Sequence, residues 1–156
     1  MTNKKKGFSL IELLIVVAII LIIAAIAIPN LPRSKIAANE ASAVGSIRTI
    51  TTSEITYQMS NATYTDLTGL TATGTNLIDS VFAATPANKS GYTFTIPAAD
   101  TADFVADATP MDDGKTGVRR FCATSEAVVR WGDKSQTVPS AATGCVSGSG
   151  FNPLNN

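Results

Sequence analysis

The sequence predicts an α+β fold in which one long amino-terminal helix packs on an antiparallel sheet. Three observations predict it: an uncharged apolar run reaches Asn30, a helical apolar pattern continues to about Asn61, and short alternating runs separated by turn residues follow. One long helix followed by several strands is typical of an α+β domain. With 156 residues, the chain has the length of one such domain and not of two.

The first element is an apolar helix over residues 8–28, which only Ser9 and Glu12 interrupt. As a helix these 21 residues would extend about 32 Å, enough to cross a hydrocarbon core of about 30 Å. Three lysines at positions 4–6 precede it, which by the positive-inside rule favours a cytoplasmic start. We therefore expect a single membrane-spanning helix with the rest of the chain on the far side.

The residues alone leave the processing of this segment open. A secretory signal peptide could be cut after Ala27, leaving Ile28 as the new amino terminus, but the apolar run is long for one and contains Glu12. A carboxylate inside a membrane needs a partner. It could reach the interface near Phe8, or meet a positive charge from another copy. Cleavage between Gly7 and Phe8 would free such a charge as an α-amine.

The second half of the helix, residues 29–62, begins at a break. Pro29 and Pro32 each remove a helical hydrogen bond and predict either a helix end at the membrane face or a kink within one long helix. Beyond them, apolar side chains recur on one helical face, which predicts an amphipathic helix. These positions are Ile36, Val44, Ile47, Ile50 and Tyr57.

Residues 63–156 predict a globular domain. A connecting loop over residues 65–90 contains a short helix at 77–83, and four alternating runs predict strands. These runs are Tyr92–Pro97, Phe104–Thr109, Val118–Thr124 and Ala127–Trp131. We expect them to form an antiparallel sheet packed on the amphipathic half of the helix.

Cys122 and Cys145 are the only cysteines. A domain outside the cytoplasm lies where thiols oxidise, so a disulfide is expected, with two separate buried thiols as the alternative. The bond would close a 24-residue loop and stabilise the fold by about 3 kcal/mol. Two thiols without histidine make only half a metal site.

Composition argues against catalysis and against nucleic acid as a ligand. The chain has no histidine, which removes the commonest general base and most zinc sites. Lys+Arg and Asp+Glu are equal at 12 each, so no basic excess indicates a specific nucleic-acid site. Asp112-Asp113-Gly114 favours a turn over a calcium loop. We expect no catalytic residue, no metal and no cofactor, and hence not an enzyme.

Lys6-Gly7-Phe8-Ser9-Leu10-Ile11-Glu12-Leu13, followed by an apolar run ending Ile28-Pro29-Asn30, resembles the class III signal of type IV pilins and of type II secretion pseudopilins. The similarity covers residues 1–132, with its specificity falling after about residue 62. It implies the pilin fold: a long kinked helix, a four-stranded antiparallel sheet, and a disulfide from Cys122 to Cys145 that staples the carboxy-terminal loop.

The same resemblance implies how the chain is processed. Prepilin peptidase would remove the leader, residues 1–7, by cutting after Gly7, and Phe8 would be N-methylated. Glu12 would pair with the α-amine of Phe8 in a neighbouring subunit. Residues 8–28 would then form the core of a filament, with the kink at Pro29 and Pro32.

The implied function is a structural subunit of a type IV pilus, serving adhesion, twitching motility, DNA uptake or a related task. The implied partners are other copies of the chain, minor pilins, prepilin peptidase, an inner-membrane assembly platform with its motor ATPase, and membrane lipid before assembly. The subunit would be stored in the inner membrane, with a cytoplasmic amino terminus and a periplasmic domain, and then reach the cell surface.

The alternative is a pseudopilin of a type II secretion system. The major pseudopilin usually lacks this disulfide and carries an acidic calcium loop near its carboxy end. Here Asp133 is the only acidic residue after Glu126, which favours the pilin.

Overall fold

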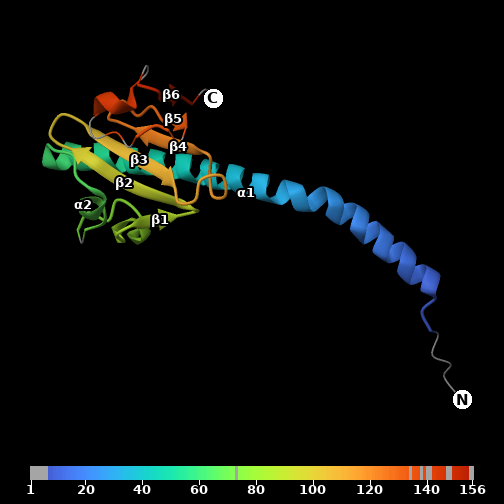
Figure 1. Cartoon of the computed structure of the whole chain (residues 1–156). Coiled ribbons are helices and arrows are strands. Elements are labelled where there is room, and N and C mark those ends of the chain that lie inside the picture. The colour runs from blue at the N-terminus through green and yellow to red at the C-terminus, as the bar shows by residue number, and fades with distance from the viewer. Residues whose placement is uncertain are drawn as a thin grey trace, which may run out of the picture. The chain divides into compact units, whose positions relative to one another are not determined.

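A computed structural model describes residues 7–72, 74–133, 135–137, 139, 142–146 and 149–154 (Figure 1). The lysines at positions 4–6 therefore lie outside the described residues. The chain divides into two compact units, Met1–Ser34 and Lys35–Asn156. Each is described by itself below.

Helix α1 spans Leu10–Asn61 and ends at the residue expected from the sequence. Ala62 follows with a φ of 57°, a left-handed conformation that stops the helix. Pro29 and Pro32 both lie inside α1 and not at its end. A kink at these prolines stays a prediction.

The sheet has six strands in the order β1-β2-β3-β4-β5-β6, each antiparallel to the next. This corrects the expected number, which was four. The strands are β1 (Ala87–Lys89), β2 (Tyr92–Ala99), β3 (Phe104–Pro110), β4 (Arg119–Ala123), β5 (Arg130–Asp133) and β6 (Asn152–Pro153).

The two additional strands, β1 and β6, have three and two residues, too few for alternation to be recognised in the sequence. The last expected strand was placed too early. Ala127 has a φ of 58° in the turn after β4, so β5 begins only at Arg130.

The segment between α1 and β1 has more structure than the expected loop. Helix α2 spans Leu67–Thr71 and the 3₁₀-helix η1 spans Ser80–Ala83, inside the expected helix at 77–83. Asp66 caps α2 by accepting a hydrogen bond from the Gly69 amide, and Asp79 caps η1 in the same way. An aspartate that accepts such a bond satisfies one of the free N–H groups of the first turn.

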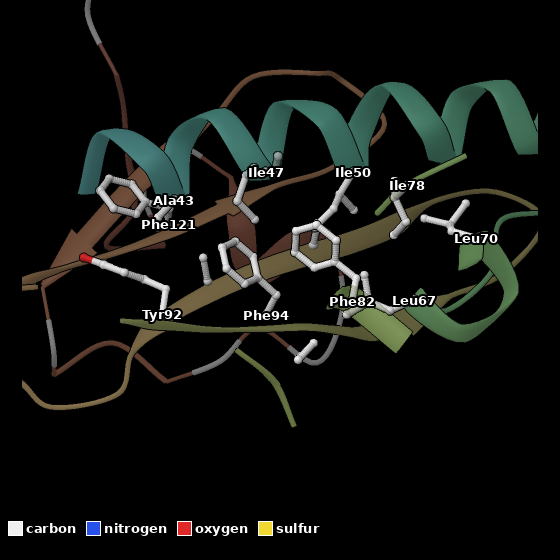
Figure 2. Packing of buried hydrophobic residues seen from close by; sticks show 14 of the residues in the cluster. Ala43, Ile47, Ile50, Leu67, Leu70, Ile78, Phe82, Tyr92, Phe94 and Phe121 are labelled. Carbon is white, nitrogen blue, oxygen red and sulfur yellow. The ribbon is translucent and has the colours of Figure 1, made fainter. Parts of the chain in front are cut away.

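The main core lies between α1 and one face of the sheet (Figure 2). Ala43, Ile47 and Ile50 of α1 are buried there, as the helical pattern predicted for the two isoleucines. The sheet contributes Tyr92, Phe94 and Phe121, while Phe82 of η1 packs edge-on against Phe94 with ring centroids 5.2 Å apart. The whole of this core comes from residues after Ser34.

A smaller core covers the other face of the sheet. Val105, Cys122, Cys145 and Phe151 are buried together, and Cys122 is disulfide-bonded to Cys145. The expected disulfide is thus confirmed. It holds the carboxy-terminal segment, including the 3₁₀-helix η2 (Ala142–Cys145), against β4.

Candidate functional site

The first part of α1, blue in Figure 1, is apolar and uncovered. Every leucine, isoleucine and valine from Leu10 to Leu31 is exposed, from 45% at Val17 to 79% at Leu10, and Phe8 is 83% exposed. By length and composition α1 is able to cross a membrane. A surface this apolar requires lipid or protein around it.

Glu12 lies in the first turn of α1. It is the only charged residue between Phe8 and Pro32. Its Oε2 accepts a hydrogen bond from the Ser9 amide at 2.9 Å. This is the carboxylate half of a capping box, in which the third helical residue bonds back to the residue before the helix. The spacing Ser9-x-x-Glu12 is the sequence signature of this cap, which was not among the predictions made from the sequence.

Gly7 and Phe8 are both exposed, directly before the helix. A Cβ added at Gly7 would meet no atom within 4 Å, so the fold itself does not require glycine there. The reason for a glycine at this position must therefore lie outside the packing of the chain.

In the second unit, Glu40 joins α1 to the sheet. Its Oε1 accepts hydrogen bonds from the amides of Val118 and Arg119 at 3.0 and 3.1 Å, and its Oε2 accepts from Arg119 Nε at 2.7 Å. Asn39 adds a bond from Nδ2 to the Thr116 carbonyl at 2.8 Å. These contacts fix the start of β4 on the helix. These contacts could not be predicted from the sequence, because a single Glu in an amphipathic helix has no distinctive spacing.

The face of the sheet under the disulfide holds an ion pair that is buried on both sides. Arg120 Nε lies 3.6 Å from Asp107 Oδ1, and the Thr109 hydroxyl donates to Asp107 Oδ2 at 2.7 Å. Arg120 also donates to the Gln136 carbonyl of the covering segment. Burial raises the pKa of Asp107 to about 6, although Thr109 and Arg120 both lower it.

The part of the chain that the structure describes contains no group of side chains that could hold a metal ion. Within it, no three His, Cys, Asp or Glu side chains come together to hold a metal ion. Asp112 in the turn after β3 pairs with Lys115 Nζ at 2.8 Å.

Residues 2–28 match the family model described as the prokaryotic N-terminal methylation motif. The chain therefore carries this motif, which covers the residues before α1 and the exposed apolar part of α1 as far as Ile28. The chain is also 39% identical over 85 residues to the type IV wide pilus major component PilA4 of Thermus thermophilus. The match covers 51% of this chain and 65% of that relative. The resemblance to type IV pilins is thereby confirmed.

Proposed function

We propose that this chain is the precursor of a structural subunit of a type IV pilus, and that it polymerises through the apolar first part of α1. One observation carries the proposal: the segment that matches the methylation motif includes the first part of α1, where every leucine, isoleucine and valine up to Leu31 is exposed. The similarity to a pilus component supports the same function.

Before assembly, residues 8–28 would be held in the inner membrane. The lysines at positions 4–6 favour a cytoplasmic amino terminus and a periplasmic domain. Cleavage after Gly7 would leave the apolar helix on the mature chain, because the cut precedes it. The helix would then exchange lipid for other copies of itself, and close packing of its side chains would hold the filament together.

Glu12 would direct this exchange by pairing with the Phe8 α-amine of a neighbouring subunit. The bond from the Ser9 amide occupies one oxygen, and an ionised carboxylate has about four acceptor positions, so a second donor can be accepted. An α-amine at a helix amino terminus is opposed by the positive end of the helix dipole, which makes an acidic partner favourable. Leaving either charge unpaired in lipid is costly.

The first experiment is the intact mass and amino-terminal sequence of the chain recovered from its own cells. A start at methylated Phe8 is the expected result. A start at Met1 or at Ile28 would contradict the proposal, because no amine of Phe8 would then exist.

Electron microscopy of material sheared from the cell surface tests the filament itself. Long fibres that contain this chain are expected. Their absence, together with loss of protein secretion when the chain is deleted, would instead indicate the pseudopilin. The disulfide Cys122–Cys145 supports the pilus subunit.

A further inference from the structure

Glu54 is a titratable residue that the proposed function does not use. It lies on α1, seven residues before the helix ends at Asn61, and its side chain is wholly buried. A buried carboxyl group ordinarily has a charged partner or a full set of hydrogen bonds. Glu54 has neither.

Its contacts come from the chain that follows α1. Oε2 accepts a hydrogen bond from the Thr65 amide at 3.0 Å, whereas Oε1 is buried with no partner among the described residues. None of the described lysines or arginines forms an ion pair with Glu54.

The titratable groups that face Glu54 are acidic. Asp66 repels its charge. The pKa of the Tyr64 phenol is raised first by burial and then by the charges of Asp103 and Glu54. For Glu54 itself, burial is the largest effect and raises the pKa to about 7, with Asp66 adding to it. The hydrogen bond from Thr65 acts in the opposite direction and is outweighed.

The bond to Thr65 closes the segment from Ala62 to Thr65, which we call the α1–α2 connection. Elsewhere the connection is held by the Tyr64 amide, which donates to the Asp100 carbonyl at 2.9 Å, and by the Tyr64 ring, 4.9 Å from that of Phe104. Asp66, the cap of α2, follows directly. Glu54 is thus the one side chain of α1 seen to hydrogen-bond the backbone of this connection in the described part of the chain.

We propose that Glu54 is a pH-dependent latch, which holds the α1–α2 connection closed while its carboxyl group is protonated and releases it on ionisation. The proton passes to solvent, and the charge that remains must be hydrated. Water reaches it when the connection lifts from α1, which also increases the separation between Glu54 and Asp66. Asp66 then moves with the start of α2.

The test is hydrogen exchange of the Tyr64 and Thr65 amides in the full chain in detergent micelles, from pH 5.5 to 8.5. Rates are divided by the intrinsic rate at each pH, and Ala106 in β3 is the reference amide. We expect the protection of Thr65 to fall at least about tenfold across this range, which corresponds to about 1.4 kcal/mol. Protection that stays constant would overturn the proposal.

Two variants sharpen the test. In Glu54→Gln the side chain keeps an oxygen for the Thr65 amide and cannot ionise, so protection should stay high at every pH. Asp79→Asn removes the charge of a different helix cap and should behave as the unmodified chain. A pH-dependent loss in Glu54→Gln equal to that of the unmodified chain would refute the latch.

If Glu54→Gln fails to fold, the pH dependence of the side-chain carboxyl ¹³C shift of Glu54, measured in the unmodified chain, replaces the variant as the test of the latch. A midpoint near 7 that coincides with the fall in Thr65 protection supports the latch, and a midpoint near 4.5, or a titration without any change in Thr65 protection, overturns it. Neither measurement depends on filament formation, so the latch and the pilus function can fail separately.

Discussion

Glu40 and Asp107 are both buried carboxylates, at 4% and 1% exposure, and they differ in what surrounds them. Glu40 accepts three hydrogen bonds, from the amides of Val118 and Arg119 and from the Arg119 guanidinium. Asp107 has an arginine at 3.6 Å and one hydroxyl donor. Ionisation is therefore costly for Asp107.

The pH dependence of stability should reveal this cost. The pKa of Asp107 rises from 3.8 to about 6 on folding, so the folded state keeps a proton that the unfolded state releases in that window. The free energy of unfolding should therefore fall by about 2–3 kcal/mol as pH rises from about 4 to 6. Denaturant titrations at several pH values measure it. Asp107→Asn should lose this part of the slope, and an unchanged slope would disprove the assignment.

Glu12 allows the charge and the cap to be separated. Glu12→Ala removes both, whereas Glu12→Gln keeps an oxygen for the Ser9 amide and removes the charge. If the charge pairs with the Phe8 amine, both variants should be cleaved normally and should yield at least about tenfold fewer filaments, since an unpaired charge in lipid costs a few kcal/mol. Ser9→Ala keeps the backbone donor and is the control. Full assembly of Glu12→Gln would leave Glu12 only its capping role.

Among the elements, α1 and the sheet are joined by apolar packing and by the Glu40 contacts. The ion pair of Glu40 with Arg119 has its carboxylate side chain 6% exposed, and that of Asp112 with Lys115 is open to solvent on both sides. Removing one partner of a buried pair leaves the other donors unsatisfied, whereas an exposed pair contributes little.

Glu40→Ala should therefore lower the free energy of unfolding by about 2–4 kcal/mol. Lys115→Ala is the matched control and should leave stability unchanged within error, because its ion pair is solvated. Chemical denaturation of both variants provides the comparison. Equal effects would mean that the Glu40 contacts do not hold the sheet to α1.

On the other face of the sheet, the disulfide between Cys122 and Cys145 holds the carboxy-terminal segment to β4. Replacing both Cys122 and Cys145 by serine should lower the free energy of unfolding by about 2–4 kcal/mol, because the disulfide no longer restricts the conformational entropy of the unfolded chain. Chemical denaturation of this variant without reductant measures the decrease in the free energy of unfolding. The unmodified chain with reductant is the control. A loss well under 1 kcal/mol would show that Asp107, Arg120 and the apolar contacts suffice.

The helix and the central strands could be predicted from the sequence, because the periodicity of their apolar residues extends over enough positions. Ile47 and Ile50 fell on the predicted face, and Cys122 with Cys145 formed the expected pair. The features that could not be predicted from the sequence are short elements and contacts between residues far apart in the chain. β1 and β6 have too few residues to alternate, and Glu40 meets Val118 across 78 positions. The partner of Glu54 is a backbone amide, which has no sequence signature.

For the whole molecule, the division into two units has a direct test. The core consists of residues after Ser34, and none of the leucines, isoleucines and valines before it is buried. A fragment of residues 35–156 should therefore fold without the apolar segment and unfold in one cooperative transition. Circular dichroism during thermal unfolding measures this. A fragment that shows no cooperative transition would mean that the first unit is needed for folding.

The strand order β1 to β6 also sets the sequence in which the domain can fold. Each strand pairs with its neighbour along the chain, and the connections from β1 to β5 are short, so little loop-closure entropy opposes these pairings, whereas β6 follows β5 only after a longer segment that includes η2. The contacts between α1 and β4 span far more of the chain and come last on the same reasoning. A chain with this topology can thus add its first five strands one hairpin at a time, each beside a strand already formed.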